Sequence, residues 1–435
     1  MSEAAAVARQ AIPTRLSRHQ ITGFWAAWLG NTLDGTDISI AGIALAPALL
    51  TLLPLSGMAC DAGTVGYLAS VMLALYLIGW SLSFLAGPLV DRFGRTKMLA
   101  VCCATYAIFT AVGGLSQNIW QLGATRFLAG LALGGEWAAA STYVAEIWPE
   151  DRRKMGAGYL HTGIYFGSLL AGVISYFVSP RFGWRGLFLC GLAPVIMAVL
   201  TLAGVREPER WEGKVREASV RRTNPMFAIF GAQYLRTTLV MAALMTVAST
   251  GLWGGSQYFA TAVTLMAREQ GLTPARGSEL AAYISVIVSA GTIIGCVLAP
   301  VLAERVGRKR ALATYFAVMM VMIVVTWGWI FYRPPSEGLR LFFGAAFVIG
   351  LAQGYFALFT LWLPELYGTI VRGTGFAFCT TSCRFIGAGV NFAVGAAAKS
   401  MGTLGTPLAC IAVVFAIGLL IIPLARETHG QPLPD

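Results

Sequence analysis

The chain contains repeated apolar runs of about 20 residues, the length that an α-helix needs to cross the hydrocarbon core of a bilayer. Hydrophobic residues make up 57% of the chain and charged residues only 12%, whereas about a quarter of the residues in a soluble domain are charged. The sequence therefore predicts an all-α membrane protein with twelve transmembrane helices. These lie near residues 22–48, 64–86, 97–116, 119–142, 157–178, 184–204, 237–263, 281–302, 311–331, 339–362, 374–397 and 405–424.

The segments between these runs are too short to form a soluble domain. The longest, residues 205–236, is polar and basic and falls midway along the chain. We therefore expect two bundles of six helices, residues 1–204 and 237–435, joined by a cytoplasmic linker over 205–236.

The net charge of +11 could indicate a nucleic-acid partner, but the positions of the basic residues argue otherwise. Most of the 31 Lys and Arg residues lie in the N-terminal segment and in one set of alternate loops. Basic residues gather on the cytoplasmic side of membrane proteins. The distribution predicts a multi-pass protein of the bacterial inner membrane with both termini in the cytoplasm, and no nucleic-acid partner.

The cysteines and histidines show no spacing typical of a metal site or a disulfide framework. Of the eight Cys, only Cys60 is expected in an outer loop, and the three His residues are widely scattered. We also find no nucleophile and base at catalytic spacing. The sequence predicts no metal, no cofactor and no enzyme.

The chain carries an internal repeat. "GPLVDRFGRTKML" follows the second run and "PVLAERVGRKRAL" follows the eighth, and "AEIWPEDRRK" and "PELYGTIVRG" follow the fourth and tenth. At constant offsets, Asp91 and Arg95 match Glu304 and Arg308. The chain is therefore interpreted as a duplicated six-helix unit. In the other two segments, Glu146 matches Glu365, and Glu146/Arg153 and Glu365/Arg372 are the corresponding pairs.

These repeated loops, with "REPERW" and "RETHGQPLP" after the sixth and twelfth runs, resemble the major facilitator superfamily. The resemblance implies two bundles around a central site that opens alternately to either side of the bilayer, and a monomer. It also implies a cytoplasmic gate whose ion pairs hold the outward-open form. We expect this gate to contain Asp91, Arg95, Glu146, Arg153, Glu304, Arg308, Glu365 and Arg372.

Within the superfamily, three segments resemble proton symporters of organic acids, the sialate/lactate and aromatic-acid or metabolite branches. They are "LDGTD" in the first run, "GLALGGEWAAASTYVAEIWPEDRR" around the fourth and "TTSCRFIGAG" in the eleventh. Glu136, in "GGEW", is expected to belong to the charge network at the cytoplasmic end.

Two carboxylates, Asp34 and Asp37, interrupt the first apolar run. Charged residues in membrane helices generally face the bundle interior, and a spacing of three places both on one face with Asn31. Two close carboxylates in a poorly solvated site cannot both be ionised cheaply, so at least one is expected to bind a proton near neutral pH. Asp34 could equally be a proton site, a substrate contact or a residue that bends the helix.

The resemblance assigns a partner to Asp37. In sugar-porter-like proton symporters an Asp of the first helix pairs with an Arg of the fourth, and Asp37 and Arg126 occupy those positions. Asp37 is then the main proton carrier and Arg126 its switchable partner, because protonation of Asp37 would break the ion pair. A static ion pair between the two helices is the alternative.

Arg384 is the second base within a predicted span, and no acidic residue lies in the same span. An unpaired guanidinium in a cavity can bind a carboxylate through two parallel hydrogen bonds. Neutralisation by Asp34 or Asp37 is the alternative. Other residues expected to line the cavity, for each of which helix packing is an equal alternative, are Asn31, His161, Tyr165, Trp253, Gln257, Gln353 and Asn391.

The leading hypothesis is a proton-coupled symporter that takes up a small organic anion, such as a monocarboxylate, an aromatic acid or an acidic sugar. The alternatives are proton-coupled sugar uptake and a drug efflux antiporter. Drug antiporters of the superfamily carry a Gly-Pro signature in the fifth span, and "GYLHTGIYFGSLLAGVIS" contains no Pro.

Close approach of helices is expected at Gly163–Gly167 and Gly291–Gly295, which have the GxxxG spacing.

Overall fold

The chain is almost entirely helical in the computed structural model, which describes residues 16–58, 62–218, 224–254 and 258–435. The first half contains α2 (Arg18–Leu55), α3 (Ala62–Leu82), η1 (Ser83–Ala86), α4 (Gly87–Phe93), α5 (Arg95–Gly113), α6 (Ile119–Ile147), α7 (Arg153–Cys190) and α8 (Ala193–Gly204). The second half contains α11 (Leu235–Gly254), α12 (Phe259–Glu269), α13 (Pro274–Val306), α14 (Arg308–Gly328), η3 (Ile330–Tyr332), α15 (Pro335–Ala352), α16 (Tyr355–Trp362), η4 (Leu363–Glu365), α17 (Arg372–Thr381), α18 (Arg384–Met401), α19 (Gly405–Cys410), α20 (Ala412–Ile421) and η5 (Ile422–Leu424). Two short helices, α9 (Glu209–Ala218) and α10 (Pro225–Ala228), lie between the halves.

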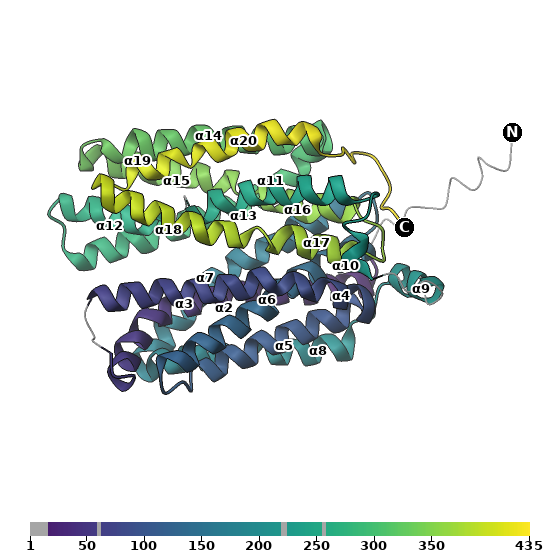
Figure 1. Cartoon of the computed structure of the whole chain (residues 1–435), viewed down its shortest axis with the longest axis horizontal. Helices are drawn as coiled ribbons and strands as arrows, with labels where there is room; N and C mark the ends of the chain where they lie inside the picture. Colours follow the sequence, from purple (N-terminus) through teal and green to yellow (C-terminus); the bar gives the residue numbers. More distant parts are fainter. Residues whose placement is uncertain (1–15, 59–61, 219–223, 255–257) are drawn as a thin grey trace, which may run out of the picture.

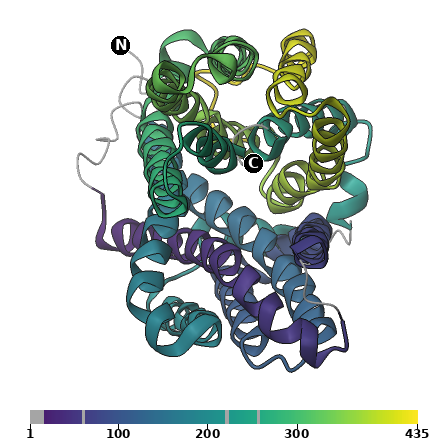
Figure 2. The same cartoon turned by 90° about the vertical axis from the view of Figure 1, so that its left-hand side faces the viewer.

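The two halves form two helical bundles that lie against each other along their length. Figure 1 shows the first half, in purple and blue, below the second half, in green and yellow. The end-on view in Figure 2 shows the same two groups of helices separated by a seam. The predicted two-bundle architecture is confirmed.

Nine helical segments in the described ranges are long and apolar enough to cross a bilayer. One of them, Arg153–Gly204, contains two of the predicted spans. The two remaining predicted spans correspond to α6 and to the successive helices α17 and α18. The helices therefore account for all twelve predicted spans.

Several predicted spans are broken or extended in the structure. The run 339–362 consists of α15 and α16, and the run 374–397 of α17 and α18. The fifth run continues through a kink at Gly183 into the sixth. Hydropathy measures the length of an apolar segment, and backbone breaks inside protein are tolerated at membrane depth, so these breaks leave no trace in hydropathy.

Close helix contacts occur at both predicted GxxxG segments. A Cβ added to Gly163 would lie 2.8 Å from the Trp28 carbonyl oxygen, and one added to Gly167 would collide with the Thr32 carbonyl. In the second half, a Cβ on Gly291 would lie 2.5 Å from the Phe347 carbonyl oxygen. The backbones of α2 and α7, and of α13 and α15, therefore meet without intervening side chains, as the spacing predicts.

Polar side chains are concentrated inside the molecule. The buried charged residues include Asp34, Asp37, Arg126, Glu136 and Arg384, whereas many large hydrophobic side chains are exposed on the outside. Lipid can cover such an apolar surface, and charged groups in membrane helices generally face the bundle interior. A functional site is therefore expected in the interior between the bundles.

Candidate functional site

The loops that carry the internal repeat meet at one end of the molecule, here called the charged end and defined by Arg95, Glu146 and Arg372. Arg95 donates to both carboxylate oxygens of Glu146, from Nε at 3.1 Å and from Nη2 at 3.0 Å. The side chains of Arg95 and Glu146 are fully buried. Gly94 and its repeat equivalent Gly307 have φ of 111° and 91°, which favours glycine, so the turn is shared by both copies.

Three groups of contacts at the charged end join the two halves. Arg372 Nη1 donates to Glu146 Oε1 at 2.5 Å, and Arg95 Nη2 donates to the Thr369 carbonyl at 2.6 Å. Asp91 accepts from the backbone N–H of Gly373 at 2.9 Å and from the backbone N–H of Thr374 at 2.8 Å. The charged end is therefore closed by buried, charge-assisted hydrogen bonds between the bundles.

The second copy of the repeat forms an equivalent cluster within its own half. Arg308 donates to Glu365 from Nε at 3.1 Å and from Nη2 at 2.9 Å, and it pairs with Glu304 at 2.7 Å. Glu304 also lies 3.7 Å from Lys154 of the first half. In each half, the Arg of the repeated loop thus binds a Glu further along the chain, Arg95 with Glu146 and Arg308 with Glu365.

The pairs that the repeat suggested, Glu146/Arg153 and Glu365/Arg372, are not the pairs that form. Glu146 contacts Arg95 and Arg372, and Arg153 pairs with Glu150 at 3.1 Å. A constant offset shows which residues are equivalent in the two halves, but not which ones meet across the seam. The eight predicted gate residues nevertheless all lie at the charged end.

A carboxylate caps each repeated loop from the end of its own half. Glu207 accepts from the backbone N–H groups of Thr96 and Lys97, both at 3.0 Å. Glu427 accepts from the backbone N–H groups of Arg308 and Lys309, both at 3.0 Å. Partial burial raises the pKa of Glu427, but these and further backbone N–H groups together outweigh it and lower the pKa, because hydrogen bonds to the carboxylate favour its charged form.

The C-terminal segment crosses the charged end. Arg372 Nη2 donates to the Pro434 carbonyl at 2.5 Å, and Arg210 of α9 pairs with the Asp435 side chain at 2.7 Å. Leu433 N–H donates to Glu150 of the first half at 3.2 Å. The last residues therefore contact both halves and the segment between them.

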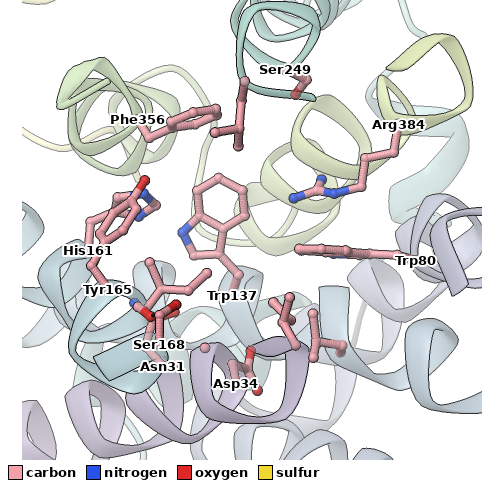
Figure 3. Close-up of a pocket in the computed structure, with 15 residues that line it drawn as sticks. Asn31, Asp34, Trp80, Trp137, His161, Tyr165, Ser168, Ser249, Phe356 and Arg384 are labelled. Atoms are coloured by element: carbon pink, nitrogen blue, oxygen red, sulfur yellow. Dashed lines mark hydrogen bonds between the residues drawn. The ribbon is translucent and has the colours of Figure 1, made fainter. Parts of the chain in front are cut away.

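A cavity of about 160 Å³ lies between the two bundles. Its walls come from helices of both halves, and Figure 3 shows side chains from each converging on it. Of the described residues that line it, Asp34 carries the carboxyl group and Arg384 the guanidinium group. The lining residues are Asn31, Asp34, Gly35, Ile38, Trp80, Leu133, Trp137, His161, Ile164, Tyr165, Ser168, Ser249, Leu252, Phe356 and Arg384.

Arg384 lies at the junction of α17 and α18, where the break between the two helices turns its side chain into the cavity. Its guanidinium carbon lies 3.7 Å from the centroid of the Trp80 ring and 5.8 Å from that of Trp137. Nη1 donates to the Thr380 carbonyl, whereas Nε has no hydrogen-bond partner among the described residues. The predicted alternative of neutralisation by Asp34 or Asp37 is not seen.

Aromatic rings form much of the wall opposite Arg384. The His161 and Phe356 rings stack with centroids 5.9 Å apart, and Trp137 lies 5.3 Å from His161. In Figure 3, the Arg384 guanidinium points across Trp80 toward Trp137, and His161 and Phe356 lie on the other side. Cations and aromatic rings attract through the ring quadrupole, so Trp80 and Trp137 hold the guanidinium without neutralising it.

The predicted lining residues have mixed outcomes. Asn31, His161 and Tyr165 line the cavity; Asn31 Nδ2 also donates to the Leu160 carbonyl at 2.8 Å. Gln353 is buried at the break between α15 and α16 and is not among the lining residues. Trp253 and Asn391 belong to α11 and α18, but their side chains lie outside the described set, as does Gln257 entirely.

The predicted ion pair between Asp37 and Arg126 is not formed in this structure. Neither carboxylate oxygen of Asp37 and none of the guanidinium nitrogens of Arg126 has a hydrogen-bond partner among the described residues, although both side chains are buried. The Arg126 guanidinium instead lies 4.7 Å from the centroid of the Phe188 ring. Both residues lie in facing helices of the first half, which leaves the two charges near each other but separated.

The position predicted for Glu136 is wrong. Glu136 is fully buried, and its Oε1 lies 2.8 Å from where a Cβ on Gly30 of α2 would stand. It precedes Glu146 by ten residues on α6, which is about 15 Å along a helix axis. Glu136 therefore lies deep in the first bundle beside α2, far from the charged end.

A second, larger cavity of about 1160 Å³ lies between α2, α3 and α18. Arg126, Tyr76, Tyr258 and Phe392 are among its lining residues. Ile38 lines both cavities, so they adjoin. The molecule is therefore sealed at the charged end and hollowed between the bundles on the other side of the central cavity.

Trp80, Trp137, Ser249 and Phe356 line the central cavity and were not predicted from the sequence. Each lies in an apolar run rich in small residues, and the sequence of such a run does not distinguish a side chain that packs between helices from one that lines a cavity. Only the arrangement of seven separate helices around one space distinguishes them.

Comparison with known proteins gives one family and one fold. A profile of the Major Facilitator Superfamily matches residues 27–392. The chain is 29% identical over 423 residues to the probable 4-methylmuconolactone transporter of Cupriavidus pinatubonensis, covering 95% of this chain and 92% of that protein. It is 29% identical over 361 residues to the cis,cis-muconate transport protein of Acinetobacter baylyi, covering 81% of each chain.

Among solved structures, the proton:xylose symporter XylE bound to 6-bromo-6-deoxy-D-glucose matches with a TM-score of 0.76. The match covers 96% of this chain and 98% of that one, at 17% sequence identity. A likeness at this identity shows that the fold is shared.

Proposed function

Because the chain belongs to the major facilitator superfamily, and is a transporter of that family, we propose that it takes up a small organic anion together with protons by alternating access. The family has two bundles with a central binding site that opens to either side. The finer assignment of cargo and coupling ion rests on the cavity and on the buried charges around it.

Arg384 is the observation that carries the assignment of an anion. It is buried, lines the central cavity and contacts no carboxylate among the described residues. A buried cation without a charged partner is costly, and a carboxylate can accept two parallel hydrogen bonds from a guanidinium. An organic acid bound here would supply the missing charge, and the aromatic wall would contact its carbon skeleton.

The similar proteins support an organic acid. The two relatives described above are named for transport of 4-methylmuconolactone and of cis,cis-muconate. An anionic cargo also explains Arg384 better than a neutral sugar does. We therefore place a monocarboxylate, an aromatic acid or an acidic sugar in the central cavity.

Proton coupling is assigned to Asp37 with Arg126. Both are buried in the first bundle and each lacks a hydrogen-bond partner among the described residues. A protonated Asp37 has no charge to attract Arg126, so the separated arrangement is that expected of the proton-loaded form. Release of the proton would restore the attraction and draw α2 and α6 together.

The sealed charged end is assigned to the cytoplasm of the bacterial inner membrane, because basic residues gather on that side. The larger cavity on the opposite side of the site would then face outward. In this arrangement the structure corresponds to the outward-facing state of a transporter whose two termini are cytoplasmic.

The assignment is tested with purified protein in liposomes. Wild-type protein is expected to concentrate gallate or N-acetylneuraminate when the outside is more acidic, but not xylose or tetraphenylphosphonium. Asp37→Asn should lower the concentration ratio that the protein reaches and retain exchange of internal for external acid. Glu269→Gln, at an exposed position of α12, is the control; concentration by Asp37→Asn at the control level would contradict the coupling assignment.

Arg384→Ala tests the anion site separately. Loss of charge-assisted hydrogen bonds worth about 1.5–3 kcal/mol should weaken binding of the acid by about 10- to 150-fold. The affinity for the methyl ester of the same acid should fall little, because the ester group carries no charge. Arg340→Ala, at an exposed position of α15, should change neither. Equal losses for acid and ester would exclude Arg384 as the anion receptor.

A further inference from the structure

Two acidic residues other than Asp37 are also buried in the first bundle. Glu136 of α6 is fully buried and Asp34 of α2 is 2% exposed. The assignment of Asp37 and Arg126 to proton coupling does not use either of them. Both lie at membrane depth, where an ionisable residue indicates a functional site.

The two carboxyl groups lie at the contact between α2 and α6, within electrostatic reach of each other. Glu136 Oε1 lies 2.8 Å from the position that a Cβ on Gly30 would take. Gly30 and Asp34 are four residues apart and therefore lie on the same face of α2. The absence of a side chain at Gly30 makes room for Glu136 one turn away from Asp34.

Among the residues that the structure describes, no base forms an ion pair with either carboxyl group. Both oxygens of Glu136 and Oδ1 of Asp34 have no hydrogen-bond partner among the described residues. The hydroxyl of Tyr106 from α5 is also buried without a hydrogen-bond partner, within electrostatic reach of both carboxyls. The other titratable groups around the pair are Cys102 and Cys103 of α5, Asp37 of α2, Arg126 of α6, Tyr76 of α3, His161 of α7 and Arg384 of α18.

Three of these groups are bases, and each packs against an aromatic ring; the His161 ring stacks on Phe356. Arg126 lies against the Phe188 ring and Arg384 against the Trp80 ring. Two ionised carboxylates side by side, buried and without a counter-ion, repel each other and lose their hydration. One proton shared between them removes the repulsion and leaves a single charge, and Tyr106 could donate a hydrogen bond to it.

Asp34 connects this pair to the cargo. It lines the central cavity, whereas Glu136 is not among the lining residues. An organic anion held at Arg384 would add a negative charge to the same cavity, which favours the neutral form of a nearby acid. Binding of the anion and loading of a proton would then reinforce each other.

We propose that Asp34 and Glu136 form one proton-binding site, separate from Asp37, that carries a second proton with each organic anion. This proposal rests on the proposed function. The proton enters from water through the central cavity, binds to a carboxylate oxygen of the pair and leaves to water on the other side. A monoanion moved with two protons carries one net positive charge inward per cycle.

The number of protons is read from the limiting concentration ratio of gallate in liposomes. With the membrane potential held at zero and the outside one pH unit more acidic, two protons per anion give a ratio of about 100 and one proton gives about 10. Uptake into protein-free liposomes is subtracted. The wild type is expected to reach about 100.

Variants assign the second proton to the pair. Glu136→Gln should lower the ratio to about 10 while retaining exchange, and Asp34→Asn should also lower the ratio to about 10. Glu269→Gln should keep about 100. A wild-type ratio of about 10, or an unchanged ratio in a folded Glu136→Gln variant, overturns the proposal and leaves proton coupling intact. A wild type that does not concentrate gallate at all contradicts the proposed function instead.

Should Glu136→Gln fail to fold, Asp34→Asn tests the same site from the cavity side. If both fail, the wild-type ratio still distinguishes one proton from two. Tyr106→Phe then probes the pair without removing a carboxyl. It should shift the pH at which gallate binding is half-maximal, and no shift would count against a proton site beside Tyr106.

Discussion

Replacement of Glu146 by Gln should open the charged end. Glu146 is the carboxylate that Arg95 of its own half and Arg372 of the other half share, and all three side chains are fully buried. When the halves separate, the contact with Arg95 can persist, but the contact with Arg372 cannot. Glu146→Gln therefore weakens the closed form more than the open form.

The magnitude follows from the one hydrogen bond of Glu146 that crosses between the halves. Arg372 Nη1 donates to Glu146 Oε1 at 2.5 Å, and a hydrogen bond to a charged group contributes about 1.5–3 kcal/mol. The ratio of open to closed molecules should rise by about 10- to 150-fold. The contacts of Asp91 with Gly373 and Thr374 remain, so the closed form is weakened rather than abolished.

Distances between spin labels report this ratio. Arg92 of α4 and Arg305 of α13 are exposed at the charged end on opposite halves. Both can be replaced by labelled Cys after the eight native cysteines are removed. Glu146→Gln should add a longer distance to the distribution measured by double electron–electron resonance.

Two comparisons make the experiment decisive. Asp151→Asn removes an exposed carboxylate whose partner is the adjacent Arg152, and should leave the distances unchanged. Arg372→Gln should produce the same shift as Glu146→Gln, and the double variant little more, because both remove one interaction. An unchanged distance distribution in Glu146→Gln, or full additivity in the double variant, would refute the role of this bond.

Two further predictions concern stability. Gly167→Ala should lower the melting temperature in detergent, because its Cβ collides with the Thr32 carbonyl and overpacking costs about 1–3 kcal/mol. Gly172→Ala on the same helix has nothing within 4 Å of its Cβ and should leave the melting temperature unchanged. Equal effects of the two substitutions would contradict the packing argument. Glu427→Gln removes the cap of Arg308 and Lys309. The pKa of Glu427 is lowered in the folded protein, so its contribution is present above the unfolded value of about 4.3 and is lost as the pH falls through the lowered value. The melting-temperature difference from wild type should be largest near neutral pH and vanish in acid, and a constant difference would count against it.

The helices and their duplication were predictable because both depend on local sequence. An apolar run must form a helix in lipid to satisfy its backbone groups, and the repeated loops identify equivalent positions. The break before Tyr355 was not predictable, because it depends on the close approach of Gly354 to Gly295 of α13. The break before Arg384 was not predictable either, because Arg384 packs against Trp80 of the opposite bundle. The break before Arg384 is also what directs its guanidinium into the cavity.

The sequence predicted which charged residues line the cavity better than it predicted which charged residues contact each other. Arg384 and Asp34 line the cavity as expected from charged residues in apolar runs. Glu136 was misplaced because the predicted span ended at residue 142, whereas α6 continues to Ile147 and carries Glu136 deeper. Partners such as Glu146 and Arg372 come from different halves, and no spacing along the chain encodes their contact.

The contacts of the last residues bear on how the protein should be handled in the laboratory. Pro434 and Asp435 are bonded to Arg372 and Arg210. An affinity tag or fluorescent reporter attached directly after Asp435 would begin inside this cluster. A long polar spacer, or attachment at the other terminus, would leave these bonds undisturbed in binding and transport measurements.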